Sequence, residues 1–146
     1  MKQSARNIFV SGSISPTMIG ESIQHHQVKT AIGAHSIFLG QVRADALENS
    51  TVVAIEYTAY EAMALEVAHS IREEMFRKYE LTCMHIYHSL GIVHVGEISL
   101  FVFTSSPHRT AAINACDETV ERIKKELPVW GKELASNSQH VWKENK

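Results

Sequence analysis

The chain has 146 residues, of which 45% are hydrophobic and 21% charged, and its formal net charge is -2. A chain of this length can bury about 68–70% of its unfolded surface, so we expect one domain over residues 1–146. The near-neutral charge argues against binding to nucleic acid through the overall field of the protein, and any anion site must be local. No apolar stretch is long enough to cross a bilayer, so we expect no membrane span.

The two cysteines, Cys83 and Cys116, form no CxxC pair. A small secreted domain that depends on disulfides usually has more cysteines, so both are interpreted as reduced thiols. The first residues contain no apolar run of signal-peptide length. We therefore expect a cytoplasmic protein.

The first half of the chain alternates short apolar runs with amphipathic stretches. Ser15 and Pro16 suit the N-cap and the first position of a helix. The apolar spacing of Ala64, Ala68 and Ile71 is typical of a second helix. The predicted elements are a strand over 8–10, a helix over 16–25, strands over 33–42 and 52–60 with a loop at 43–50, and a helix over 61–79.

The second half predicts two further strands and one helix. Residues 83–90 alternate in polarity, and residues 98–104 form an apolar run typical of a central strand buried on both faces. A third helix is expected over 109–126, ended by Pro128, and Gly131 is interpreted as a break in the tail. Helices and strands are interspersed without strict βαβ alternation. The pattern therefore predicts an α+β domain with a mixed or antiparallel sheet and about three helices.

Residues Ser105 to Arg109 lie between the most buried strand and the third helix. A helix N-terminus offers free N–H groups to an anion, and His108 and Arg109 would add positive charge. Such residues predict a phosphate or carboxylate site. A helix cap at Ser106 with a solvated Arg109 explains them equally well.

Basic residues also surround a Pro-Val-Trp element at the end of the third helix. Lys124 and Lys125 fall in its last turn, where cations complement the helix dipole, and Lys132 follows Trp130 and Gly131. Taken by themselves, these neighbouring residues favour a structural role for the lysines at the end of the helix. Arg43, at the end of a predicted strand, has the fork that matches phosphate oxygens, although an arginine there is commonly just solvated.

The nine histidines do not predict a metal site. His85 and His88 are three residues apart in a predicted strand and should face opposite sides of it. No cysteine or carboxylate completes a tetrahedral set at a recognisable spacing, and the pair His25 and His26 is weaker still. We expect neither a bound metal nor a cofactor.

Several segments, taken in order, resemble the large-subunit family of molybdopterin synthase. Each motif alone is weak, but five in the family's order make a specific match over most of the chain. The matching segments are Phe38–Arg43, Ile55–Tyr57 with Tyr60 and Met63, His88–Gly91 with Val95–Glu97, Ser105–Arg109, and Lys124–Glu133.

The resemblance implies an α/β hammerhead fold and a homodimer within a heterotetramer. Each end of the dimer would bind a small ubiquitin-like subunit whose C-terminal thiocarboxylate delivers sulfur to cyclic pyranopterin monophosphate, forming the dithiolene of molybdopterin. Lys124 looks like the family's catalytic lysine. Arg43, His108 and Arg109, together with Lys124, look like its substrate-binding residues, and His108 and Arg109 are expected to serve the neighbouring subunit.

One position departs from the family pattern. The family commonly has a second lysine directly after the tryptophan, where this chain has Gly131 followed by Lys132. Lys132 is therefore the candidate for the second catalytic lysine, since glycine permits unusual backbone geometry. Lys132 is, however, one residue beyond the family position, and a side chain shifted by one residue commonly faces solvent instead.

Two non-enzymatic interpretations remain open. A binding module would use the same cationic residues to hold an anion or a protein tail without turnover, and Gly131 favours it. A purely structural oligomer subunit would leave Arg43, His108 and Lys124 on unrelated surfaces.

Overall fold

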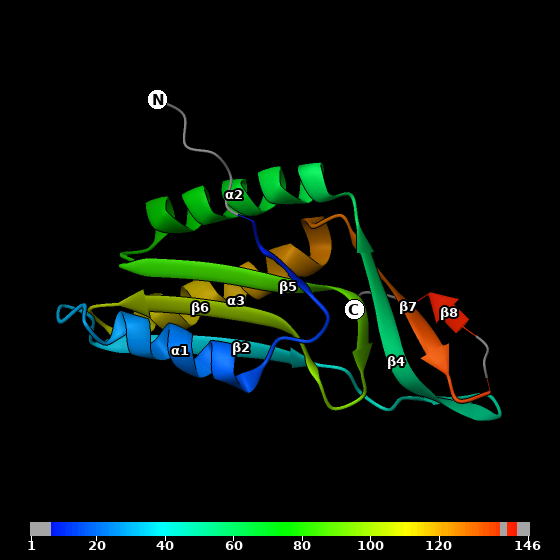
Figure 1. Ribbon diagram of the computed structural model, residues 1–146. Helices are drawn as coiled ribbons and strands as arrows, with labels where there is room; N and C mark the ends of the chain where they lie inside the picture. Colours follow the sequence, from blue (N-terminus) through cyan, green and yellow to red (C-terminus); the bar gives the residue numbers. More distant parts are fainter. Residues whose placement is uncertain (1–6, 138–139, 143–146) are drawn as a thin grey trace.

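The computed structural model describes residues 7–137 and 140–142. Three helices and a mixed sheet confirm the predicted α+β fold (Figure 1). The elements are β1 (Phe9–Ser11), α1 (Pro16–His26), β2 (Ala34–Gln41), β3 (Ala46–Leu47), β4 (Ser50–Ala59), α2 (Glu61–Lys78), β5 (Cys83–His94), β6 (Ile98–Ser106), α3 (Arg109–Glu126), β7 (Val129–Ala135) and β8 (His140–Trp142).

The sheet follows the order β2-β6-β5-β4-β7-β8, with β1 beside β5 and β3 beside β4. All its ladders are antiparallel except the one between β1 and β5. The strand β5 joins two parts, because residues 83–88 pair with β6 and residues 91–94 pair with β4. Gly91, which has a φ of +85°, lies where the partner changes. Figure 1 shows β4 and β7 running across the direction of β5 and β6.

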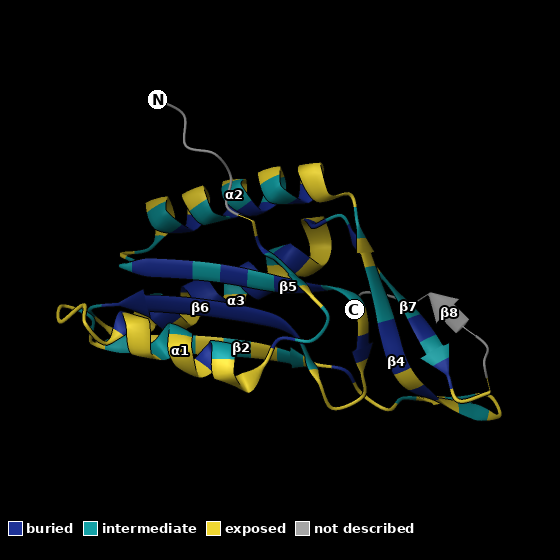
Figure 2. Cartoon of the chain, viewed as in Figure 1, coloured by how far each residue is buried: buried dark blue, intermediate teal, exposed yellow. Residues whose placement is uncertain are grey.

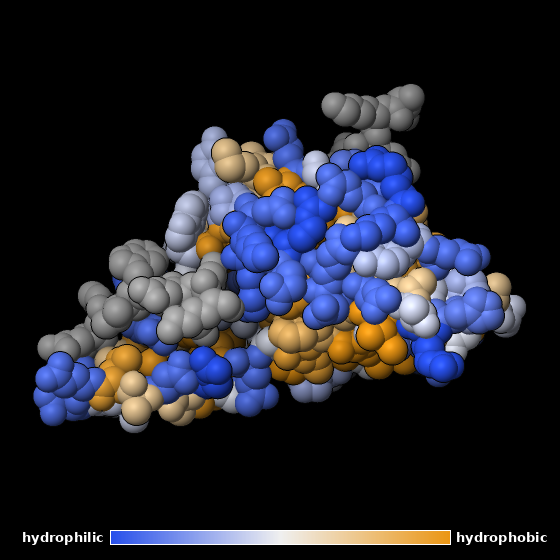
Figure 3. All heavy atoms as spheres, turned by 180° about the vertical axis from the view of Figure 1, so that it is seen from behind, coloured by the Kyte–Doolittle hydropathy of each residue, from blue (hydrophilic) through white to orange (hydrophobic). Residues whose placement is uncertain are grey.

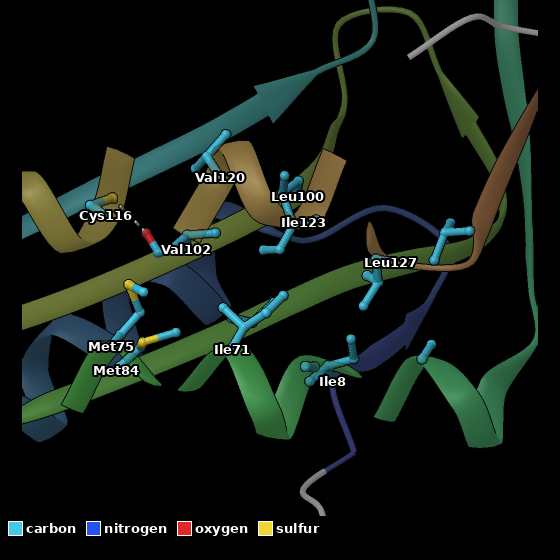
Figure 4. Close-up of a cluster of buried hydrophobic side chains, with 14 residues drawn as sticks. Ile8, Ile71, Met75, Met84, Leu100, Val102, Cys116, Val120, Ile123 and Leu127 are labelled. Carbon is cyan, nitrogen blue, oxygen red and sulfur yellow. Dashed lines mark hydrogen bonds between the residues drawn. The ribbon is translucent and has the colours of Figure 1, made fainter. Parts of the chain in front are cut away.

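Helices cover both faces of the part formed by β5 and β6. The helices α2 and α3 pack with β5 and β6 around one apolar cluster, which includes Ile71, Met84 and Ile123 (Figure 4). On the other face, α1 packs against Phe101 and Phe103. From Ser99 to Ser106, β6 is buried throughout (Figure 2), which confirms the predicted central strand. Burial of this apolar surface is the main driving force for the fold.

Two predictions about the loops were wrong. Gly131 does not break the tail: it lies inside β7, paired with Tyr57 of β4. The polar segment 43–50 contains the short strand β3, which forms a hairpin with β4. Both strands are stabilised by pairing with β4, a partner that local polarity does not reveal.

The helix ends follow the sequence closely. Ser15 caps α1 by accepting a hydrogen bond from the Met18 N–H at 3.1 Å. Pro128 follows α3, as expected. Ser106 does not cap α3, because the N-cap is His108, which makes no side-chain capping bond. In the described ranges, no helix combines the length and the apolar character needed to span a membrane.

Candidate active site

A cavity of about 90 Å³ lies where the two parts of the sheet meet the end of α3. It draws residues from five strands (β2, β4, β5, β6 and β7), from α3 and from the segment between α3 and β7. Its lining residues are Gly40, Gln41, Tyr57, His88, Ser99, Leu100, Ile123, Lys124, Leu127, Val129 and Gly131.

His88 is the buried titratable group of this cavity. Its Nδ1 lies 2.8 Å from the carbonyl oxygen of Ser89, which can only accept a hydrogen bond, so Nδ1 carries the proton and Nε2 is left with a lone pair. Burial lowers the pKa of His88 below its ordinary value of 6.5; the hydrogen bond to Ser89 opposes this shift, and the charge of Lys124 adds to it. The ring is therefore neutral at pH 7 and able to accept a proton.

Tyr57 contributes a phenol beside this imidazole. Its ring meets the His88 ring edge-on, with centroids 5.1 Å apart, and its hydroxyl donates to Ser99 Oγ at 3.2 Å. Burial raises the pKa of Tyr57 above 10; the hydrogen bond to Ser99 lowers it, and the nearby charge of Glu133 raises it further. Tyr57 therefore remains a neutral hydrogen-bonding group.

Lys124 brings positive charge to the cavity from the last turn of α3. Of the described residues that line the cavity, it is the one with a permanent cationic side chain. Lys124 and its neighbour Lys125 are both exposed to solvent, but Lys125 does not line the cavity. The structure thus separates these two adjacent lysines, as the family resemblance does and their local helical spacing does not.

Gly131 and Lys132 lie on opposite faces of β7. Gly131 faces Tyr57 across the β4–β7 ladder and lines the cavity. Lys132 pairs with Glu56, with 3.5 Å between Lys132 Nζ and Glu56 Oε1. Successive side chains of a strand point to opposite faces, so the structure does not bring Lys132 into this cavity beside Lys124.

The other predicted anion-binding residues lie away from the cavity within one chain. Arg43 is exposed and forms an ion pair with Asp45, with Nε and Oδ1 3.1 Å apart. His108 and Arg109 are exposed at the start of α3, whereas Lys124 lies near its end. Lys124 lies 15 positions after Arg109, which corresponds to roughly 22 Å along the helix.

Sequence reasoning did not single out His88 or Tyr57 as functional residues. Both occur in the segments that carry the family resemblance, but His88 was weighed only as a metal ligand and Tyr57 received no role. Gln41 and Ser99 gave no signal of their own. These side chains meet only through the packing of strands distant in sequence.

The histidine pattern predicted the faces of β5 correctly, and it did not reveal one grouping that the structure brings together. His85 contacts His26 of α1, and His88 contacts Tyr57, which confirms that the two rings lie on opposite faces of β5. However, one cysteine does lie close to two histidines in the folded chain. His26, Cys83 and His85 place their ligand atoms within 4.8 Å of one another. His26 lies 57 positions before Cys83 in the sequence, and the packing of α1 brings it to β5. No local sequence motif reveals a contact over that separation.

The chain matches the family model described as MoaE protein over residues 13–126. It is 41% identical over 117 residues to molybdopterin synthase catalytic subunit 1 of Aedes aegypti, covering 78% of this chain and 75% of that protein. It is 40% identical over 116 residues to the molybdopterin synthase catalytic subunit of Drosophila willistoni, again over 78% of this chain but only 31% of that longer protein.

Solved structures agree with these sequence matches. The crystal structure of molybdopterin synthase from Staphylococcus aureus superimposes with a TM-score of 0.79 at 28% identity, covering 92% of this chain and 94% of that one. A complex of subunits 1 and 2 of molybdopterin-converting factor from Helicobacter pylori shares the fold, with a TM-score of 0.79 at 20% identity over 94% of this chain and 90% of that one. The family match and the shared fold together show that this chain belongs to the MoaE family of molybdopterin synthase catalytic subunits.

Proposed function

We propose that this chain transfers sulfur from the C-terminal thiocarboxylate of a small ubiquitin-like subunit to cyclic pyranopterin monophosphate, forming the dithiolene of molybdopterin. The observation that carries this proposal is the placement of Lys124 beside the neutral, buried His88 in one cavity. The reaction is proposed to take place in the cytoplasm, where the two free cysteines, Cys83 and Cys116, would remain reduced.

Each residue has a distinct proposed role. Both reactants are anionic, and after the sulfur has bonded to the pterin, water would attack the acyl carbon, so that the acyl–sulfur bond breaks and the tail leaves as a carboxylate. The ammonium group of Lys124 would stabilise the negative charge that develops on the acyl oxygen in this step. His88 Nε2 has the lone pair to accept a proton from the reacting pterin. Tyr57 would hold the ring of His88 in place through their edge-on contact.

The proposed homodimer explains how distant cationic residues would reach one site. The strand β2 begins beside Ser106, near His108 and Arg109, and ends at Gly40 and Gln41 in the cavity. Among the described strands, β2 pairs along one edge only, with β6.

A second copy that paired antiparallel with the open edge of β2 would place its own Arg109 end near the Lys124 cavity. Exposed apolar side chains of β2, Ile37 and Leu39, favour such a contact. Seen from behind in Figure 3, hydrophilic surface covers the middle of the molecule and apolar surface follows the lower edge, where β2 runs. Arg43, two residues beyond the end of β2, would then bind phosphate from the same side.

Reconstitution tests the proposal directly. The purified chain is incubated with a thiocarboxylated small subunit and cyclic pyranopterin monophosphate, and the oxidised product is measured by fluorescence. We expect turnover by the wild type and at least about a hundredfold loss in Lys124→Ala. Lys125→Ala, which changes an adjacent lysine outside the cavity, is the matched control and should retain activity. Binding of the small subunit without any dithiolene formation by the wild type would instead favour the non-catalytic binding module.

A further inference from the structure

A second group of reactive side chains lies on the face of the sheet opposite the cavity. Cys83 and His85 occupy alternate positions of β5 and therefore share a face. His26, the last residue of α1, packs over that face, with its ring centroid 4.7 Å from that of Phe103. Two elements distant in sequence thus converge on one point.

The distances within this group suit a metal ion. His26 Nε2 and His85 Nε2 are 2.9 Å apart, and Cys83 Sγ lies within 4.8 Å of both rings' ligand atoms. Tetrahedral zinc, bound at about 2.0–2.1 Å by nitrogen and about 2.3 Å by sulfur, sets its donors roughly 3.3–3.6 Å apart. Small side-chain movements are enough to reach that geometry. His26 and Cys83 are buried and His85 is half-buried, so the site is enclosed.

The hydrogen bonds already orient the ligand nitrogens. His26 Nδ1 lies 2.6 Å from the carbonyl oxygen of Ser22, to which it donates, leaving the lone pair on Nε2. A backbone carbonyl that fixes the second nitrogen is the usual support of a metal-bound histidine. The contact between the two Nε2 atoms then requires that His85 Nε2 carries the proton. On metal binding that proton would move to Nδ1 of the His85 ring, which leaves the Nε2 lone pairs of both histidines for the cation.

Lys29 is the group that such a cation must displace. Its ammonium nitrogen donates to Cys83 Sγ at 2.9 Å, and its charge opposes an incoming divalent ion. Lys29 lies beyond the end of α1 and is exposed, so its side chain is able to swing into solvent. The thiolate of Cys83 would then bind the metal instead.

We propose that His26, Cys83 and His85 form a Zn²⁺ site that fastens the end of α1 to β5. The two nitrogen donors and one sulfur donor suit a borderline-soft ion, and the fourth position of the tetrahedron is left to water or another small ligand. The site is independent of the proposed sulfur transfer, because β5 separates it from His88 and the cavity.

Cobalt substitution tests this site without any assay of activity. The full chain, stripped of metal with a chelator, is titrated with Co²⁺ and then with Zn²⁺. We expect one Co²⁺ per chain, with the intense visible bands of tetrahedral cobalt and a near-ultraviolet sulfur-to-cobalt band. Zn²⁺ should displace Co²⁺ and raise the melting temperature. Lys29→Gln should bind either ion more tightly, because the opposing charge is gone.

Matched variants assign the ligands. Cys83→Ser and His26→Ala should each weaken binding by at least about a hundredfold. Cys116→Ala, which removes the other buried thiol, and His25→Ala, the exposed neighbour on α1, should bind as the wild type does.

Failure of the wild type to bind Co²⁺ and Zn²⁺ would overturn the proposal, as would an unchanged titration in Cys83→Ser. Where Cys83→Ser fails to fold, as judged by circular dichroism, the half-buried His85→Gln decides. If His85→Gln gives the same cobalt spectrum as the wild type, the proposed site is contradicted. If the tetrahedral cobalt bands are lost in His85→Gln, the site is supported.

Discussion

Gly131 lies directly opposite Tyr57 in the β4–β7 ladder, and a Cβ atom at residue 131 would come within 3.3 Å of the Tyr57 ring and 2.9 Å of Ile55 Cγ2. Ile55 is almost fully buried, so it has little room to move. The space that a side chain at residue 131 would need is therefore occupied in this chain by Ile55 and Tyr57. Glycine here allows the close approach of β7 to β4.

We predict that Gly131→Ala lowers the free energy of unfolding by about 1–3 kcal/mol, the usual cost of forcing extra atoms into a packed site. Urea denaturation measures it. Gly20→Ala is the control, because a Cβ at Gly20 meets nothing within 4 Å on α1, and alanine there should stabilise the helix by roughly 0.5–1 kcal/mol. Equal or greater stability of Gly131→Ala would show that Ile55 and Tyr57 do not exclude a side chain.

Lys132→Ala tests whether the lysine after Gly131 takes part in catalysis. Because Lys132 faces Glu56 rather than the cavity, we expect the rate of dithiolene formation to change by no more than a few fold. The partly exposed ion pair should contribute no more than about 1 kcal/mol to stability. A loss of activity as large as that of Lys124→Ala, with the fold intact, would assign Lys132 to the site after all.

The buried His88 predicts a dependence of stability on pH. Its pKa in the folded protein lies below 6.5, so the unfolded chain takes up a proton first as the pH falls. The contribution of His88 to the free energy of unfolding is fully present above pH 6.5. It declines below that pH by at most about 1.4 kcal/mol per pH unit, because one proton is involved. Burial also lowers the pKa of His35, so His35 makes stability fall with falling pH in the same way. The effect of His88 must therefore be measured as the difference between the wild type and a variant that lacks His88.

The measurement compares urea denaturation of the wild type and His88→Gln between pH 7.5 and about 5. The variant should show a shallower decline than the wild type, while His25→Gln, at an exposed position of α1, should follow the wild type. Parallel curves for the wild type and His88→Gln would contradict the lowered pKa.

Mixed dimers test whether Arg109 serves the neighbouring chain. Lys124→Ala and Arg109→Ala should each be impaired alone. If a site combines Lys124 of one chain with Arg109 of the other, mixing the two variants leaves one intact site in each mixed dimer. Random mixing should then restore about one quarter of wild-type activity. No recovery on mixing, with mixed dimers demonstrated by mass spectrometry, would place both residues in one chain's site.

The sequence by itself determined the α+β class, the bounds of α3, the N-cap at Ser15 and the buried character of β6. Local spacing, capping and hydrophobic runs specify these features, because they depend on residues close together in the chain. It also determined the family, through short segments in a fixed order. The family resemblance pointed to Lys124 and Lys132, but only the tertiary structure decided which of them lines the cavity, because Lys132 lies on the other face of β7 from Gly131.

The tertiary structure likewise decided that β7 is a strand, that His88 and Tyr57 meet, and that His26 approaches Cys83. Each of these depends on pairing or packing between segments far apart in the chain, which leaves no periodic signal in either segment alone.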